Sequence, residues 1–304
     1  MAYRRKRTRG VRRRPTRKRS SRRSFARKRR SARPMSRKRI LNITTTKKRN
    51  AMLTVSNTNA SGGLIALTSG QPFAVTGATG GGTALWMATA MDLNTGSGLN
   101  TVSQESLRTA TSCYMRGLSE HLRISTSTGL PWFHRRICFT SKDYAFYATA
   151  SGDTPTITPF DSVETSNGWQ RLFLNQYINS MSQTRATMEA IIFKGTFQKD
   201  WTDVLIAPVD SKRVTVKFDK TWTIKSGNTV GTVAERKLWH PMNATLVYDD
   251  DEDGVNQASS RYSTKSKTGM GDYYVYDIFT PLGGATSADI LTVSANSTLY
   301  WHEK

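Results

Sequence analysis

The side chains with the most evident chemistry are arginines and lysines crowded at the N-terminus. Residues 1–49 contain 24 of the 45 Lys and Arg residues and none of the 22 Asp and Glu residues. Residues 50–304 hold 21 basic and 22 acidic side chains, so the formal net charge of +23 belongs to the N-terminal segment. Cations at this density neutralise phosphate groups and release their counterions, which is how a nucleic acid binds a basic tail.

The basic side chains of residues 1–39 are the predicted nucleic-acid contacts and also a predicted nuclear localisation signal. They are Arg4, Arg5, Lys6, Arg7, Arg9, Arg12, Arg13, Arg14, Arg17, Lys18, Arg19, Arg22, Arg23, Arg27, Lys28, Arg29, Arg30, Arg33, Arg37, Lys38 and Arg39. The segment has few apolar side chains to bury, so it is predicted to be disordered when free. Fully extended, it would span on the order of 130 Å. A disordered tail offers no fixed geometry to base edges, which predicts binding without base specificity. A purely solvating tail is the alternative.

A second set of side chains could also contact nucleic acid. These candidates are Lys47, Lys48, Arg49, Trp132, Arg135 and Arg136, the last three from the segment WFHRR. Aromatic stacking combined with arginine contacts is a common way to hold a single strand. The favoured alternative for WFHRR is a strand whose aromatic side chains face the core and whose arginines face solvent. His134 within it is expected to be packed or hydrogen-bonded.

The acidic run DDDEDG at residues 249–254 is a weak candidate for a cation site. Asp249, Asp251, Asp253 and Gly254 match the start of a calcium loop, in which carboxylates alternate before a glycine. The glutamate expected at the twelfth position is instead Ser260, and strands are predicted on both sides where helices would be needed. The favoured alternative is a solvated acidic turn, so we expect no bound metal.

The residue types that catalysis needs do not form a recognisable motif. The four histidines stand apart in the sequence, and no HExxH, GxSxG or GxxxxGK[ST] pattern is present. The triple glycine at 80–82 indicates a flexible loop. Cys113 and Cys138 form no CxxC pair and are expected to be buried thiols. No secretory signal or membrane-length apolar run is present either. We therefore expect no enzyme activity, no cofactor and no membrane partner.

Most of the chain after the basic segment has the pattern of strands. The composition changes near residue 40, so we place the first strand or strands within 40–57, followed by glycine-rich loops. Period-two alternation of apolar and polar residues predicts strands within 135–139, 144–148, 188–197, 213–219, 221–225, 243–248, 273–279 and 290–301. The segment 160–183 is the best helix candidate.

These elements predict an all-β fold with two domains or segments. Residues 1–39 form the disordered basic arm. Residues 40–304 form a single jelly-roll sandwich of about eight core strands, with long loops and one or two short helices. A barrel or an immunoglobulin-like sandwich would give a similar pattern along the sequence.

Several segments together resemble one protein family. MAYRRKR, RPMSRKRILNITTTKKRNAML, RRICFTSK and LVYDDDEDG occur in this order, and YYVYDIFTP follows near the C-terminus. The set is similar to the coat proteins of genomoviruses, the gemycircularvirus group of small circular single-stranded DNA viruses related to geminiviruses.

The resemblance implies a structural protein that assembles sixty copies into an icosahedral shell around single-stranded DNA. It implies localisation to the virion and to the host cell nucleus, with nuclear import receptors as partners of the arm. It also suggests that the loops in 60–100, 151–169 and 249–272 lie on the outside of the shell. Two alternatives remain open. One is a ribosomal or chromatin-type nucleic-acid-binding protein, and the other is a jelly-roll enzyme or lectin with a basic targeting tail.

Overall fold

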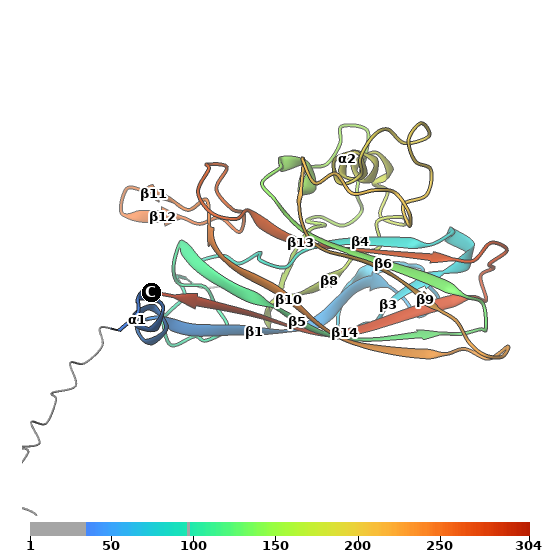
Figure 1. The fold of residues 1–304 in the computed structure, drawn as a ribbon, viewed down its shortest axis with the longest axis horizontal. Helices are drawn as coiled ribbons and strands as arrows, with labels where there is room; N and C mark the ends of the chain where they lie inside the picture. Colours follow the sequence, from blue (N-terminus) through green and yellow to red (C-terminus); the bar gives the residue numbers. More distant parts are fainter. Residues whose placement is uncertain (1–34, 96–97) are drawn as a thin grey trace, which may run out of the picture. The chain divides into compact units, whose positions relative to one another are not determined.

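Eight strands in residues 44–304 form two four-stranded antiparallel sheets that pack as two layers (Figure 1). The structure is a computed structural model that describes residues 35–95 and 98–304. The first sheet has the order β10-β5-β14-β1 and the second β4-β13-β6-β9. Numbered along the chain, the eight strands therefore run 1-8-3-6 and 2-7-4-5. This is the order of a jelly roll, so the predicted fold class is confirmed.

Four further strands extend the first sheet beyond the eight core strands, and two more form a separate hairpin. The core strands are β1 Thr46–Thr58, β4 Gly82–Met87, β5 Ser112–Thr126, β6 Trp132–Ser141, β9 Thr215–Ile224, β10 Val233–Val247, β13 Asp272–Pro281 and β14 Ile290–Glu303. The additional strands are β2 Leu64–Ser69, β3 Phe73–Thr76, β7 Val163–Thr165, β8 Gly168–Phe173, β11 Asp251–Asp253 and β12 Asn256–Ala258. Of these, β2 and β8 pair with β1, β7 pairs with β8, and β3 pairs with β14.

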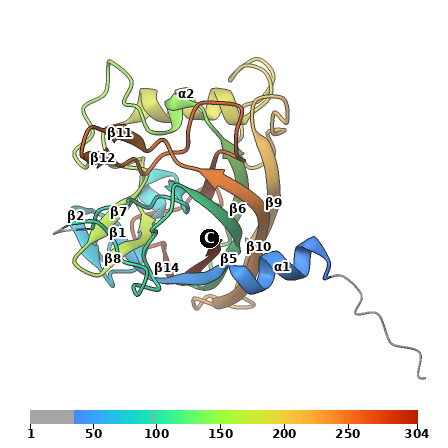
Figure 2. The ribbon, with the colours of Figure 1, turned by 90° about the vertical axis from the view of Figure 1, so that its left-hand side faces the viewer.

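The two sheets differ in what covers their outer faces. Side chains of β5 and β14 alternate between buried and exposed, as expected when one face of a sheet meets solvent. Strand β13 is buried along nearly its whole length. Part of the insertion 142–214, including the helix α2 (Ser182–Ile192), covers the outer face of the second sheet (Figure 2), while β7 and β8 within it extend the first sheet. Tyr276 of β13 donates a hydrogen bond to Glu189 of α2 at 2.8 Å.

The insertion corrects three of the predicted elements. The helix predicted within 160–183 is wrong, because this segment forms β7 and β8. The strand predicted at 188–197 is wrong, because α2 runs to Ile192 and only isolated bridges at Phe193 and Phe197 follow it. Residues 144–148, predicted as a strand, contain the 3-10 helix η2 (Tyr144–Phe146). The first helical N–H groups of α2 donate to the carboxylate of Asp153, at 3.2 Å from Gln183 and 2.6 Å from Thr184. A capping residue thirty positions upstream leaves no local signal of the helix start.

The boundary of the basic arm also differs from the prediction. Residues Arg37–Thr44 form the helix α1, and β1 begins only at Thr46. Ser36 precedes the helix, and its hydroxyl accepts a hydrogen bond from the Arg39 N–H at 3.3 Å, the position of an N-cap. The prediction of disorder otherwise concerns residues 1–34, which lie outside the described residues. Within the described part of the chain, no helix is long and apolar enough to span a membrane.

Two arginines and two carboxylates are enclosed between the sheets and form one network. Glu120 lies on β5 of the first sheet, Arg136 and Asp277 lie on β6 and β13 of the second, and Arg171 lies on β8. All four are at most 1% exposed. Arg136 forms a bidentate pair with Asp277 at 2.7 and 2.8 Å and also contacts Glu120. Arg171 bridges the two carboxylates, at 3.0 Å from Glu120 and 2.7 Å from Asp277. The network is therefore neutral and joins the two sheets.

His134 extends this network as a neutral side chain. Its Nε2 lies 2.8 Å from Asp277, and its Nδ1 contacts Arg236 of β10. An arginine can only donate, so Nδ1 accepts and Nε2 carries the proton. Burial lowers the pKa of His134 to about 4, which keeps the ring neutral. The expectation that His134 is packed and hydrogen-bonded is confirmed.

The variant Asp277→Asn should destabilise the fold by about 3–5 kcal/mol, because it leaves buried guanidinium charge without a carboxylate. Urea denaturation would measure the loss. Glu235→Gln is the matched control, because its ion pair with Arg123 is about half exposed and worth at most about 1 kcal/mol. Equal stability of the two variants would contradict a role for the buried network.

Acidification should weaken the fold through the two buried histidines. Burial lowers the pKa of both His134 and His240 from 6.5 to about 4. The unfolded chain then binds more protons in this window, so stability falls as the pH drops from about 6.5 to about 4. Asp161 and Asp272 act in the opposite direction, because burial raises their pKa values to about 6 and about 7.

Comparison with the double variant His134→Gln/His240→Gln isolates the histidine contribution. The free energy of unfolding of the variant, measured in urea at several pH values, should change less with acidification than that of the parent. An identical pH slope in both chains would show that these rings do not stay neutral in the fold.

Candidate nucleic-acid interface

The outer face of the first sheet presents a row of cations with little opposing charge. The exposed cations on it are Lys47 and Arg49 of β1, Arg116 and Arg123 of β5, and Lys237 of β10. Glu235 is the only carboxylate that these four strands expose on this face. It lies 3.2 Å from Arg123 and 3.7 Å from His121. Within the described residues, the other four cations have no carboxylate at ion-pair distance.

Strand register sets these cations among polar and aromatic side chains. Lys237 is paired with His121, which is paired with Asn296 of β14. Arg49 is paired with Tyr300, and Lys47 with His302. Since paired residues point to the same side of a sheet, these side chains form continuous rows across the four strands.

Aromatic side chains form a platform in the middle of this face. Trp239 of β10 is 51% exposed, and its ring centroid lies 5.9 Å from that of Tyr300. Tyr114 is 38% exposed and lies 6.2 Å from the His302 ring. Strand β5 runs between β10 and β14, so the Trp239 indole must cross it to reach Tyr300.

Gly117 permits this crossing. A Cβ atom at position 117 would stand 2.7 Å from the Trp239 ring and 2.6 Å from the His240 carbonyl oxygen. Both distances are shorter than real Cβ contacts, so glycine at this position lets the indole pass over β5.

A shallow hollow lies beside the platform. It has a volume of about 230 Å³ and is lined by His121 and Arg123 of β5 and by Ser294, Ala295 and Asn296 of β14. The Asn296 amide offers both a donor and acceptors, and Arg123 offers only donors. The hollow therefore presents groups that can pair with base edges as well as with phosphate.

This combination suits an unpaired nucleic acid strand. Exposed bases stack on aromatic side chains, while nearby lysines and arginines follow the phosphate backbone.

The two cysteines do not provide an exposed, ionised thiol of the kind that acts as a nucleophile. Cys113 and Cys138 are fully buried, as predicted, and burial raises the pKa of Cys138 to about 12, so this thiol stays protonated.

The structure divides the residues that the sequence suggested as further nucleic-acid contacts. Lys47 and Arg49 are exposed on this face and remain candidates. The other four are buried and are removed as surface contacts: Lys48, Trp132, Arg135 and Arg136. The Lys48 ammonium lies 3.3 Å from Glu303, and Arg135 forms a bidentate pair with Asp219 at 2.9 and 2.7 Å.

The preferred interpretation of WFHRR was therefore half wrong. Trp132 faces the core as expected, but both arginines are buried in ion pairs instead of facing solvent. The sequence carries a signal that Arg136 is buried, but it lies in other strands. Glu120 and Asp277 stand at inward positions of β5 and β13, among buried residues. A carboxylate at such a position requires a buried partner.

Most residues of this face were not predicted from the sequence. Tyr114, Arg116, Lys237, Trp239 and Tyr300 were not named, although they alternate with buried residues in β5, β10 and β14. Of the predicted arm contacts, those in residues 1–34 lie outside the described residues. Arg37, Lys38 and Arg39 belong to the first turn of α1.

The acidic run forms a β-hairpin and not a calcium loop. Strands β11 and β12 pair antiparallel, with Gly254 at φ +60° in the turn. Asp249, Asp251 and Asp253 are exposed, so the solvated turn is confirmed. The described residues contain no group of three or more His, Cys, Asp or Glu side chains placed to hold a metal ion.

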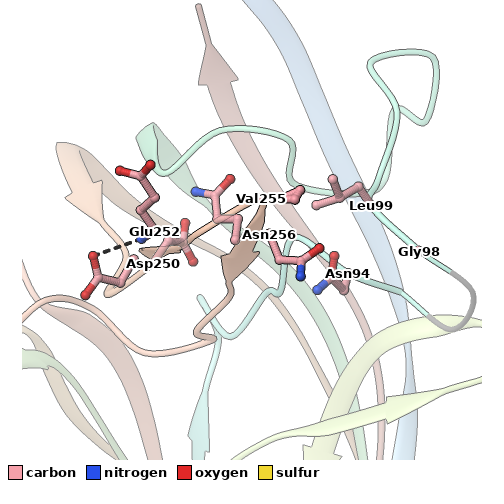
Figure 3. A pocket seen from close by; sticks show the side chains of 9 residues that line it. Asn94, Gly98, Leu99, Asp250, Glu252, Val255 and Asn256 are labelled. Carbon is pink, nitrogen blue, oxygen red and sulfur yellow. Dashed lines mark hydrogen bonds between the residues drawn. The ribbon is translucent and has the colours of Figure 1, made fainter.

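A hollow of about 870 Å³ lies between this hairpin and the segment around Asn94 and Leu99 (Figure 3). Asp250 lines it, but its carboxylate is already paired with the buried Arg108, at 2.5 and 3.0 Å. Arg108 in turn stacks on the Tyr248 ring at 3.8 Å. Asp250 thus anchors the hairpin to the sandwich.

Comparison with known proteins adds no relative to this picture. No protein-family model matches the chain, and no curated protein matches it. The fold, the charge distribution and the exposed face of the first sheet therefore remain as the guides to function.

Replacing Trp239 by alanine should weaken binding of single-stranded DNA by about 1–3 kcal/mol, the contribution of one stacked base. The loss should persist at about 0.5 M salt, where charge contacts are largely screened, because stacking is not ionic. Fluorescence anisotropy with a labelled oligonucleotide would measure it. Phe197→Ala is the control, since Phe197 is 53% exposed on the insertion. If both variants bind equally well, the face is not a stacking platform.

Proposed function

We propose that this chain is a viral coat protein that assembles into a closed shell around single-stranded DNA. The observation that carries the proposal is the joining of three features in one chain. Residues 1–49, which contain 24 cations, run through α1 into the start of β1. That strand belongs to a jelly roll, and the same sheet presents the cationic and aromatic face.

Charge supports the proposed packaging. A sixty-copy shell, the size that the resemblance to genomovirus coat proteins implies, would bring about 1,440 positive charges from its N-terminal segments. These charges could neutralise a similar number of phosphates. The folded part from residue 50 onward is nearly neutral, which lets copies pack without strong repulsion.

Localisation follows from the same segment. In this proposal the basic clusters bind host nuclear import receptors before assembly, and the finished protein resides in the virion. The contact with DNA is then shared between the segment and the sheet face.

A ribosomal or chromatin-type nucleic-acid-binding protein is the second candidate. The observation that favours it is the cationic face itself, because such proteins carry basic surface on the folded part as well as on a tail. Self-assembly separates the two candidates, since only a coat protein forms closed shells.

Purified full-length protein should form closed particles of uniform diameter that protect single-stranded DNA from nuclease. Electron microscopy and light scattering would detect the particles. Deleting residues 1–38 should abolish DNA packaging and nuclear accumulation while the jelly roll stays folded, because 20 of the basic side chains are lost. A chain that stays a monomer or dimer across salt and pH conditions would overturn the proposal.

The matched control keeps the length of the segment and removes its charge. A variant with the basic residues of 1–38 replaced by serine should behave like the deletion. If it packages DNA normally, charge is not what the segment contributes.

A further inference from the structure

The edge strands β9 and β10 of the two sheets lie next to each other along one side of the sandwich (Figure 2). The Arg236 guanidinium lies over the Trp222 ring, 4.4 Å from its centroid, and the Phe218 and His240 rings meet edge-on at 4.9 Å. Side chains, and not paired backbones, therefore close this side. We call it the β9–β10 seam, formed by Phe218, Lys220 and Trp222 of β9 and by Arg236, Leu238 and His240 of β10.

The seam carries a second cation beside Arg236. Strand register pairs Lys220 with the buried Arg136, so Lys220 stands on the side of β9 that faces the other sheet. Its side chain is exposed, and its ammonium lies 5.3 Å from the centroid of the Trp222 ring. One indole thus contacts two cations that belong to different sheets, at distances typical of cation–π contacts.

Neither cation has a carboxylate partner among the described residues. Arg236 donates to Nδ1 of His134, which uses one of the five N–H donors of a guanidinium. The carboxylates that adjoin the two cations in sequence are Asp219 and Glu235. Successive side chains of a strand point to opposite sides, and both carboxylates are paired with other arginines there.

The buried charges leave an excess of positive charge at the seam. The two arginines and two carboxylates of the buried network balance one another, and neutral His134 connects them to Arg236 as a third guanidinium. Burial and the nearby charge of Arg136 lower the pKa of Arg236 to about 10, so it stays charged at neutral pH at a cost in free energy. An anion at the seam would offset that cost.

We propose that the β9–β10 seam binds a phosphate group through the Arg236 guanidinium and the Lys220 ammonium. A guanidinium presents its N–H groups as a planar fork that fits the oxygens of a phosphate, and a lysine adds a point charge. A phosphate that is free or terminal carries a charge of about −1.5 to −2 near pH 7, which matches the two cations. A carboxylate would balance only one of them.

The site lies within a single copy of the chain, so it does not depend on the proposed function. Because its two cations belong to strands of different sheets, a bound phosphate bridges the sheets at a side where their edge strands are not paired. Two sources share this chemistry, a free phosphate and a phosphodiester of a bound strand. The charge of the site favours the free phosphate.

Thermal unfolding of the full-length chain tests the site, with inorganic phosphate added and the ionic strength held constant with chloride. A ligand that binds only the folded state raises Tm, whereas binding to the basic N-terminal segment is available to the unfolded chain as well and largely cancels. At roughly tenfold excess over the dissociation constant, Tm should rise by about 3–5 °C.

The variants Lys220→Gln and Arg236→Gln should lose most of this rise. Lys220 is exposed, so its variant should fold like the parent, and each variant is compared with its own Tm in chloride. Lys217→Gln is the matched control, because Lys217 is an exposed cation on the other side of β9, and it should keep the full rise.

The results that would overturn the site are specific. The parent would show no phosphate-dependent rise, or the two seam variants would rise as much as Lys217→Gln. An equal rise with acetate at the same ionic strength would show that the seam does not select phosphate.

Oligothymidine without a terminal phosphate then identifies the source of a phosphate that the first experiment has established. If free phosphate is the occupant, Lys220→Gln should leave the oligonucleotide-dependent rise in Tm unchanged. Loss of that rise in Lys220→Gln but not in Lys217→Gln would identify a phosphodiester of the strand as the occupant.

Discussion

The neutral network of Glu120, Arg136, Arg171 and Asp277 is the constraint on which the sandwich depends. These groups come from four strands in three parts of the chain, and each carboxylate contacts both guanidiniums. A slip of one residue in any of these strands would turn one charge away from its partners and leave the others buried and unpaired. The network therefore specifies register between the two sheets, which apolar packing alone specifies less sharply.

The same constraint decides which cations reach the surface. Arg136 and Arg171 are used internally, and Lys48 and Arg135 are paired with carboxylates. The cations that remain on the first sheet stand at alternate, outward positions of β1, β5 and β10. Gly117 then lets Trp239 lie among them. The buried ion pairs and the exposed cationic and aromatic face are thus two outcomes of one alternating pattern.

The sequence was sufficient to predict the jelly roll, the burial of both thiols and the packed state of His134. The first two have a local signal in the period-two alternation of apolar and polar residues, and His134 stands in a segment that was predicted as a strand. The start of α2 and the fate of Arg135 and Arg136 could not be found in the same way. The helix is capped by Asp153 from a distant loop. Arg136 meets Asp277, 141 positions away, and Glu120 of the other sheet, while Arg135 meets Asp219, 84 positions away. Of the candidate interface, only Lys47 and Arg49 were named in advance, because its rows exist only after four strands are in register.

The insertion 142–214 makes the protein a three-layer structure. Phe146 packs against Phe139 and Tyr274 with ring centroids 5.0 and 5.1 Å apart, and Arg135 donates to the carbonyls of Val204 and Ala207 at 2.7 and 2.8 Å. The outer side of the second sheet is therefore covered by the insertion, as its inner side is covered by the first sheet. A chain trimmed to its eight core strands would expose that sheet and become prone to aggregation. The length of this chain beyond a minimal sandwich is consequently part of its core, and any shortening or exchange of the insertion has to replace the apolar cover that it provides.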